Sequence, residues 1–389
     1  MLLVLVPVAL ATLIGLVVLW PGDGPTRAQQ GADQAYAPGT TYPDGRVVSV
    51  DLPAECLPQQ PCIGKAVVEV LDGPGNGDFQ QIELPPEVVG EGVEKGDVVV
   101  LSRDAGAEGG PVYRFTDYGR DLPLTALAVG FALCVAVVAR WRGLASLVGL
   151  GFAFFILLKF VLPGILAESS PTLVTLVGAS AIMFVVLYLA HGFSARTTTA
   201  LMGTLFGLTL VAVLGSVAVA AARLTGLTSE ETVTISTYDS TLDFSGLVLA
   251  GVVVAGLGVL NDVTITQASA IWQLKEASPE TTWGQLYKRG MAIGRDHIAS
   301  TVYTLVFAYA GAALPLLIIF DLSPQPWSVT ITSSRVAEEV VRTLVGSIAL
   351  VLAVPVTTAV GAFFATAATT EAGAAPERRI AALRARFAR

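Results

Sequence analysis

Long apolar stretches alternate with short polar links over most of the chain after about residue 120. Each stretch approaches the roughly 20 residues that an α-helix needs to cross the hydrocarbon core of a bilayer. After an apolar start at residues 1–20, the pattern predicts further spanning helices at residues 122–139, 143–166, 171–190, 199–222, 245–269, 298–320 and 340–366. We therefore predict an α-helical polytopic membrane bundle that occupies residues 122–368.

Residues 1–20 are continuously apolar. This run is longer than the 7–15-residue apolar core of a cleavable signal peptide, which favours a retained transmembrane anchor. A cleaved signal peptide is the alternative.

Residues 21–121 have a different pattern, in which short β-branched runs are separated by turn residues. The sequences GPGNG at 73–77 and EKGD at 94–97 are typical turns between strands. The runs predict strands at residues 46–52, 65–71, 79–84, 97–101 and 112–117. Strands of this length and spacing favour a small β-rich domain, either an open sheet or a barrel.

Composition supports the membrane assignment. The 389 residues are 53% hydrophobic and 14% charged, far from the usage of soluble proteins. The net charge is −8, and the charged residues lie in the β-rich segment, the links and the tail. We therefore expect the lipid bilayer as the main partner and no nucleic-acid partner.

The positive charges predict the orientation of the bundle. Arginine and lysine are concentrated in every second link and in the tail, at Arg140, Arg142, Arg196, Lys275, Lys288, Arg289, Arg295, Arg378, Arg379, Arg384, Arg386 and Arg389. The positive-inside rule places these links and the C-terminus in the cytoplasm of a cell with the protein in its inner or plasma membrane. The β-rich domain is then extracytoplasmic, where Cys56 and Cys62 could form a disulfide. Residues 369–389 are predicted to be a cytoplasmic basic tail, either an amphipathic helix on the anionic leaflet or a solvated segment.

One predicted helix carries a stripe of small and polar residues through an otherwise apolar run. The stripe consists of Gly251, Ala255, Gly258, Asp262, Thr266, Ser269 and Gln273. Their spacing of three or four places them on one face, which we expect to point into the bundle because hydrocarbon offers no hydrogen-bond partners. An ionisable group within a span usually marks function. The alternative is that Asp262 lies near the headgroups and only holds helices together.

A second stripe and one lysine are candidates for the same polar interior. His297, Ser300 and Thr304 share one face of the next predicted span. Lys159 lies inside the span at 143–166 and either pairs with Asp262 or extends to the membrane surface. Packing alone would also explain the second stripe.

Signatures of common enzymes do not occur in the sequence. It contains no HExxH, no GxSxG, no phosphate-binding loop and no paired-cysteine metal motif. We therefore expect no enzymatic activity, no metal site and no cofactor.

Several blocks of the sequence resemble one family of bacterial multi-pass membrane proteins. The blocks are GVLNDVTITQASAIWQL, GRDHIASTVYTLVFAYAGAALPLLIIF, LLKFVLPGILA, GFSARTTTALMGTLFG and VVRTLVGSIALVLAVPVTTA. They are similar to the YibE/F family, and the β segment with KGDVVVL and YRFTDYGRDLPL resembles the extracytoplasmic portion of that family. The resemblance implies an integral membrane protein described at most as a permease, and it supplies no substrate or catalytic residue.

These patterns favour a transporter or permease for an unknown small solute or ion. Its polar path would pass Asp262, Thr266, Ser269 and Gln273, with Lys159 and the stripe of His297, Ser300 and Thr304 nearby. The alternative is a non-transporting membrane scaffold or sensor whose outer β domain binds a partner. The sequence leaves the oligomeric state open, including a homo-oligomer.

Overall fold

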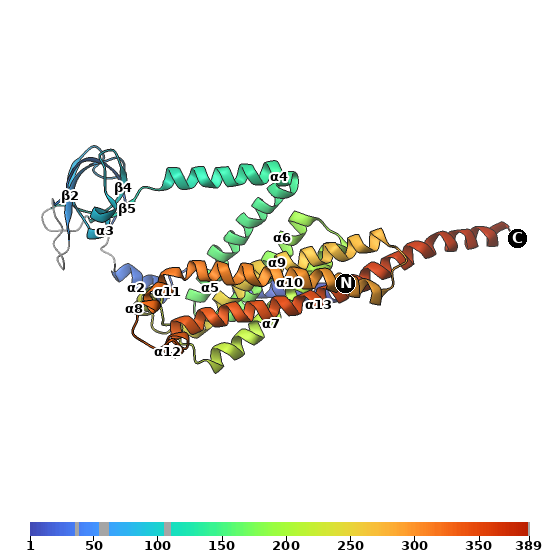
Figure 1. Ribbon diagram of the computed structural model, residues 1–389. Helices are drawn as coiled ribbons and strands as arrows, with labels where there is room; N and C mark the ends of the chain where they lie inside the picture. Colours follow the sequence, from blue (N-terminus) through green and yellow to red (C-terminus); the bar gives the residue numbers. More distant parts are fainter. Residues whose placement is uncertain (36–38, 54–61, 105–109, 388–389) are drawn as a thin grey trace. The chain divides into compact units, whose positions relative to one another are not determined.

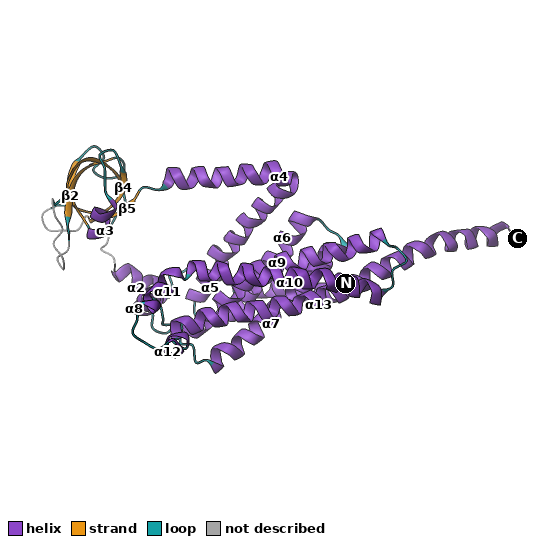
Figure 2. Ribbon diagram, viewed as in Figure 1, coloured by secondary structure: helices purple, strands orange, loops and turns teal. Residues whose placement is uncertain are grey.

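The structure is a computed structural model, and it describes residues 1–35, 39–53, 62–104 and 110–387. The contacts divide the chain into two compact units. One unit is Ala28–Val138, and the other combines Met1–Arg27 with Ala139–Arg389. Among the described residues, strands occur only in the first unit, as the colours of Figure 2 show.

The first unit contains an antiparallel five-stranded sheet with the order β3-β2-β1-β4-β5. The strands are β1 (Asp44–Asp51), β2 (Gly64–Val70), β3 (Phe79–Leu84), β4 (Val98–Asp104) and β5 (Val112–Tyr118). All five predicted strands are confirmed within a few residues. The outer strands β3 and β5 contact each other, so the sheet curls towards a barrel around a core that includes Val47, Val68 and Leu101.

The turns of this sheet follow the predicted signals. Gly73, Gly75 and Gly77 have positive φ angles in the β2–β3 turn, and Gly96 has one before β4. Glycine adopts this backbone region without the steric cost that other residues meet. The helix α2 (Arg27–Ala35) precedes the sheet, and the short helix α3 (Pro86–Glu91) follows β3.

Cys56 of the predicted disulfide lies outside the described residues. Cys62 takes part in a disulfide, and Cys134 is a free, exposed cysteine. The pairing of Cys56 with Cys62 therefore stays a prediction.

The second unit is a bundle of apolar helices (Figure 1). Its helices are α1 (Leu2–Val18), the second half of α4 (Asp121–Ile156), η1 (Leu157–Val161), α5 (Leu162–Leu166), α6 (Pro171–His191), α7 (Ala195–Ala221), α8 (Glu230–Tyr238), α9 (Phe244–Ala277), α10 (Trp283–Ala312), α11 (Leu314–Asp321), α12 (Trp327–Ile331) and α13 (Ser334–Phe387). In the described part of the chain, five helices are long and apolar enough to cross a membrane, or six if the bent pair α10–α11 forms one span. The eight spans counted from the sequence therefore stay a prediction.

One break in the helices coincides with a predicted boundary, and another lies inside the predicted span at 298–320. Arg140 has non-helical angles (φ 54, ψ −135) within α4, at the link predicted between residues 139 and 143. The helices α10 and α11 are bent by 68° at Ala313. Pro315 lies in the first turn of α11, where its missing N–H is tolerated.

The link predicted between the spans at 245–269 and 298–320 is shorter than expected. The helix α9 continues to Ala277, and α10 begins at Trp283. In the last turn of α9, the buried Lys275 donates hydrogen bonds of 2.7 and 2.8 Å to the carbonyl oxygens of Pro279 and Thr281. This ammonium satisfies carbonyl groups in the turn, as cations near helix C-termini commonly do.

The centre of the bundle is formed by α7, α9 and α13, which pack against one another. Glycines on α7 allow this close packing. A Cβ atom at Gly207 would lie 2.5 Å from a methyl carbon of Leu260 on α9, and one at Gly215 would lie 2.5 Å from Leu249. Gly203 and Gly207 thus form the packing surface that small residues four apart indicate in membrane helices.

The helix α1 packs against α6, and its Leu5 belongs to the main core of the bundle. After the helix, the ring of Trp20 lies 5.6 Å from that of Phe160. The apolar residues 1–20 therefore form a helix that contacts the bundle, and their role as an anchor stays a prediction.

Candidate functional site

The predicted polar stripe lies on the outer side of α9. Asp262, Thr266 and Gln273 are exposed, and Ser269 is half-buried. The Thr266 hydroxyl donates 2.8 Å to the carbonyl oxygen of Asp262 in its own helix. The expectation that this stripe faces the bundle interior is therefore wrong for the single chain, while its role in transport stays a prediction.

Lys159 and two residues of the second stripe are also exposed. Lys159 is exposed in η1, and no ion pair joins it to Asp262 in the described structure. Ser300 and Thr304 are exposed on α10, and the Thr304 hydroxyl donates 3.2 Å to the Ser300 carbonyl. His297 is half-buried, and its Nε2 atom has no partner among the described residues. The structure does not bring these residues together with Asp262 into an interior site.

A different set of polar residues occupies the interior, on the opposite face of α9. Thr264 and Gln267 are 0% and 2% exposed. The hydroxyls of Thr264 and Thr204 lie 2.6 Å apart, between α9 and α7. The Gln267 amide donates a hydrogen bond of 2.7 Å to the Thr358 hydroxyl and one of 2.9 Å to the Gly290 carbonyl. These bonds join α7, α9, α10 and α13 through polar groups, and we call these residues, with Thr357, the polar cluster.

Thr357 is the unsatisfied member of the polar cluster. Its side chain is fully buried, and its Oγ1 has no hydrogen-bond partner in the described structure. A Cβ atom at Gly203 would collide with this hydroxyl, so α7 approaches α13 closely here. An unpartnered buried hydroxyl costs free energy, which makes it a candidate for contact with water or a solute.

A charged cavity of about 500 Å³ lies at another level of the bundle, where α9 begins, α10 ends and α13 begins. We call it the vestibule. Its polar lining comprises Thr228, Ser229, Thr232, Tyr309, Arg335, Glu338, Glu339 and Arg342. Its apolar lining includes Phe244, Leu247, Val248 and Leu316. The volume lies in the range typical of small-molecule sites.

Glu338 and Arg342 give the vestibule its chemistry. Glu338 is 8% exposed, and its Oε2 accepts a hydrogen bond of 2.8 Å from Thr228. Arg342 forms an ion pair of 2.6 Å with Glu339. The guanidinium of Arg342 also lies beside Gly251 on α9. A Cβ atom at position 251 would lie 3.7 Å from its Nη2 atom. Glu338 Oε1 and Arg342 Nε have no partner among the described residues.

A further carboxylate, Glu231, lies on α8 next to Thr232 of the vestibule lining. Hydrogen bonding to Ser229 holds the pKa of Glu231 below its usual range, with a smaller contribution from Arg335. At the other end of α8, hydrogen bonds from the side chain and backbone of Thr241 hold the pKa of Asp239 below its usual range. Both carboxyl groups are therefore anionic at neutral pH.

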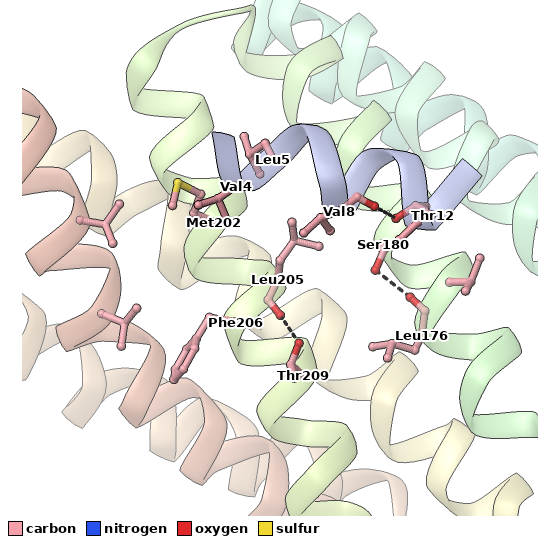
Figure 3. Close-up of a pocket in the computed structure, with 14 residues that line it drawn as sticks. Val4, Leu5, Val8, Thr12, Leu176, Ser180, Met202, Leu205, Phe206 and Thr209 are labelled. Atoms are coloured by element: carbon pink, nitrogen blue, oxygen red, sulfur yellow. Dashed lines mark hydrogen bonds between the residues drawn. The ribbon is translucent and has the colours of Figure 1, made fainter. Parts of the chain in front are cut away.

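A second cavity, of about 530 Å³, lies between α1, α6, α7 and α13 and is mainly apolar (Figure 3). Its three hydroxyl groups bond to carbonyls of their own helices. Thr12 donates to Val8, Ser180 to Leu176 and Thr209 to Leu205, at 2.8, 2.8 and 2.9 Å. The described lining of this cavity therefore offers apolar contact and no unpaired hydroxyl for recognition of a polar solute.

The comparisons with known proteins identify the family. A family model described as YibE/F-like protein matches residues 127–367. The chain belongs to this family. The YibE/F-like region contains every residue of the vestibule and of the polar cluster. It does not include the strands, so the resemblance noted for the β segment lies outside the match. No curated protein and no solved structure matches the chain.

Most of the polar interior of this YibE/F-like bundle is not among the residues predicted from the sequence. Glu338 and Glu339 precede the predicted span at 340–366, whereas α13 already begins at Ser334. The signal was a glutamate and an arginine four residues apart at the start of an apolar helix. Thr264 and Gln267 were visible as polar residues within a span, on the face opposite Asp262. Within the described residues, no three His, Cys, Asp or Glu side chains gather as a metal site would require.

Proposed function

We propose that the protein is a membrane transporter of the permease type for a small solute or ion, with the vestibule at one end of its path. The observation that carries the proposal is the buried Glu338, which has one oxygen bonded to Thr228 and one without a partner in the described structure. An ionisable group inside a helical membrane bundle is costly and usually serves a solute or ion pathway.

The path would follow α13 from the vestibule to the polar cluster. Thr357 lies about 28 Å beyond Glu338 along this helix, nearly the thickness of the hydrocarbon core. Between them, Val345, Ala349 and Ala353 are buried against the bundle core. These apolar residues separate two polar regions, so transport requires the helices to separate here in a second conformation.

Positive charges in the links orient the proposed path. The vestibule lies at the ends of helices whose links carry few basic residues, so it would open to the extracytoplasmic side. The polar cluster lies towards the basic links and would open to the cytoplasm.

Asp262, Thr266 and Ser269 require an additional surface to line a path. Asp262 and Thr266 are exposed on α9 in the single chain, and hydrocarbon cannot satisfy a carboxylate there. A second copy of the chain would cover this face. A path along Asp262 is therefore proposed only for a homo-oligomer.

The alternative function is a scaffold or sensor without transport. It is favoured by the β-rich unit, which has a core of its own and could bind a partner. In that case the bundle needs only one conformation, in which the vestibule and the polar cluster are not connected.

The distance between spin labels across the vestibule distinguishes these functions. Labels at Thr234→Cys on α8 and Ile319→Cys on α11, with Cys134 replaced by serine, would be measured in lipid nanodiscs. Transport predicts two distance populations, because the vestibule must open and close. A single population under all solute conditions would contradict the proposal. A label pair within the sheet, at Gln81 and Lys65, controls for label motion.

A further inference from the structure

The vestibule contains two unpartnered polar atoms of opposite character. Glu338 Oε1 is an acceptor on an acid, and Arg342 Nε is a donor on a guanidinium. Both atoms are buried without a hydrogen bond in the described structure. A ligand that presents one cationic donor and one anionic acceptor would satisfy both groups, whereas a simple cation or a simple anion would satisfy only one.

The positions of these side chains suit a ligand whose two charges are close together. Residues four apart on a helix are neighbours on its surface, with about 5–6 Å between their Cβ atoms. The ion pair with Glu339, at 2.6 Å, holds the guanidinium of Arg342. The lining contains two acidic and two basic residues, so a ligand without net charge leaves the vestibule electrically balanced.

The remaining wall of the vestibule is apolar. Phe244, Leu247 and Val248 come from α9, and Leu316 comes from α11. We infer that the vestibule binds a zwitterion of the α-amino acid class with an apolar side chain, its ammonium group at Glu338 and its carboxylate at Arg342. The inference rests on the proposed function only in that it makes this ligand the transported solute.

Binding by the purified full chain in nanodiscs tests the inference by calorimetry. The probes are glycine, L-leucine and L-phenylalanine, together with 3-methylbutylamine and 4-methylpentanoate, which are leucine without its carboxylate and without its amine. We expect leucine or phenylalanine to bind most tightly, and each half of leucine to bind at least about tenfold more weakly than leucine. This comparison uses the wild-type chain, so it does not depend on the folding of a variant.

Substitutions then locate the site. Glu338→Gln and Arg342→Gln should each weaken leucine binding about 10- to 100-fold, because each removes a charge-assisted hydrogen bond. Glu276→Gln, an exposed acid at the other end of α9, should leave binding unchanged. If none of the three amino acids binds saturably, or if both vestibule variants bind leucine like the wild type, the inference is wrong.

The outcomes separate this inference from the proposed function. Saturable leucine binding with a single distance between the α8 and α11 labels would support the ligand class and contradict transport. Two distance populations without amino-acid binding would support transport and overturn the ligand class.

Discussion

Thr228 and Glu338 are 110 residues apart in the chain and are joined by a hydrogen bond of 2.8 Å. The bond connects the link after α7 with the first turns of α13. The bond occupies Oε2 of the carboxylate, while Oε1 has no hydrogen-bond partner among the described residues. The link is therefore hydrogen-bonded to Glu338, the residue that we expect a solute to contact.

Removal of this hydroxyl should destabilise the vestibule. Thr228→Val leaves the buried Glu338 without its observed donor, and we expect a loss of about 1–3 kcal/mol in the free energy of unfolding. The measurement is thermal and denaturant unfolding of the purified chain in detergent. Thr225→Val is the control, because Thr225 is exposed in the same link. Equal stability of the two variants would show that the bond to Glu338 contributes nothing.

The hydroxyl pair of Thr204 and Thr264 should behave as a coupled unit. Each hydroxyl also lies within hydrogen-bond distance of a carbonyl oxygen of its own helix, so it can donate there when the other threonine is replaced. We expect Thr204→Val and Thr264→Val each to cost about 0.5–1.5 kcal/mol, and the double variant to cost less than the sum. A double-mutant cycle measures this coupling. Strict additivity would mean that the 2.6 Å contact does not hold α7 to α9.

Two glycines on different helix faces should respond oppositely to the same substitution. Gly207→Ala places a methyl group 2.5 Å from Leu260, so we expect lower stability. Gly258→Ala meets no atom within 4 Å on the outer face of α9, and alanine favours a helix by up to about 1 kcal/mol over glycine. The melting temperatures of the two variants provide the comparison. If Gly258→Ala lowers the melting temperature, another surface must pack against that face of α9.

Asp262 and Lys159 should be energetically independent. Both are exposed, and no ion pair joins them in the described structure. We expect Asp262→Asn and Lys159→Met to change the unfolding free energy additively within about 0.5 kcal/mol. A coupling as large as the roughly 3–5 kcal/mol typical of a broken buried pair would refute this separation.

The role of Asp262 in activity is a separate prediction. For a homo-oligomer that covers this face of α9, we expect Asp262→Asn to fold normally and to fail to restore the phenotype of a deletion strain. Full restoration by the folded variant would remove Asp262 from the path.

The sequence predicted the elements better than their faces. Strand alternation and the glycine turns located β1–β5, and apolar length located the long helices, because these signals depend on local chemistry. The inward face of α9 was mistaken because this helix carries polar residues on two faces. Asp262 and Thr266 lie on one, while Thr264 and Gln267 lie on the other. Only the packing of α7 and α13 against α9 selects between them.

The charged vestibule was harder to predict than the polar cluster. It combines Thr228 from one link, Phe244 at the start of α9 and Glu338 near the start of α13. Each is an ordinary residue for its position, and their proximity depends on how distant helix ends come together. The apolar criterion also began the predicted span at residue 340, which left Glu338 outside it.

The reaction of a Thr357→Cys variant with membrane-impermeant thiol reagents tests the proposed path most directly. The substitution would be made in a chain with Cys134→Ser and compared in right-side-out and inside-out vesicles. Thr228→Cys is the control for the vestibule side, and Thr266→Cys is the control for the outer face of α9. Because Thr357 is fully buried at the far end of the proposed path, a transporter must expose it to each side in turn. Our account predicts labelling at position 357 from both faces of the membrane. Labelling from one face only, or from neither, in a protein whose position 228 reacts normally would contradict it.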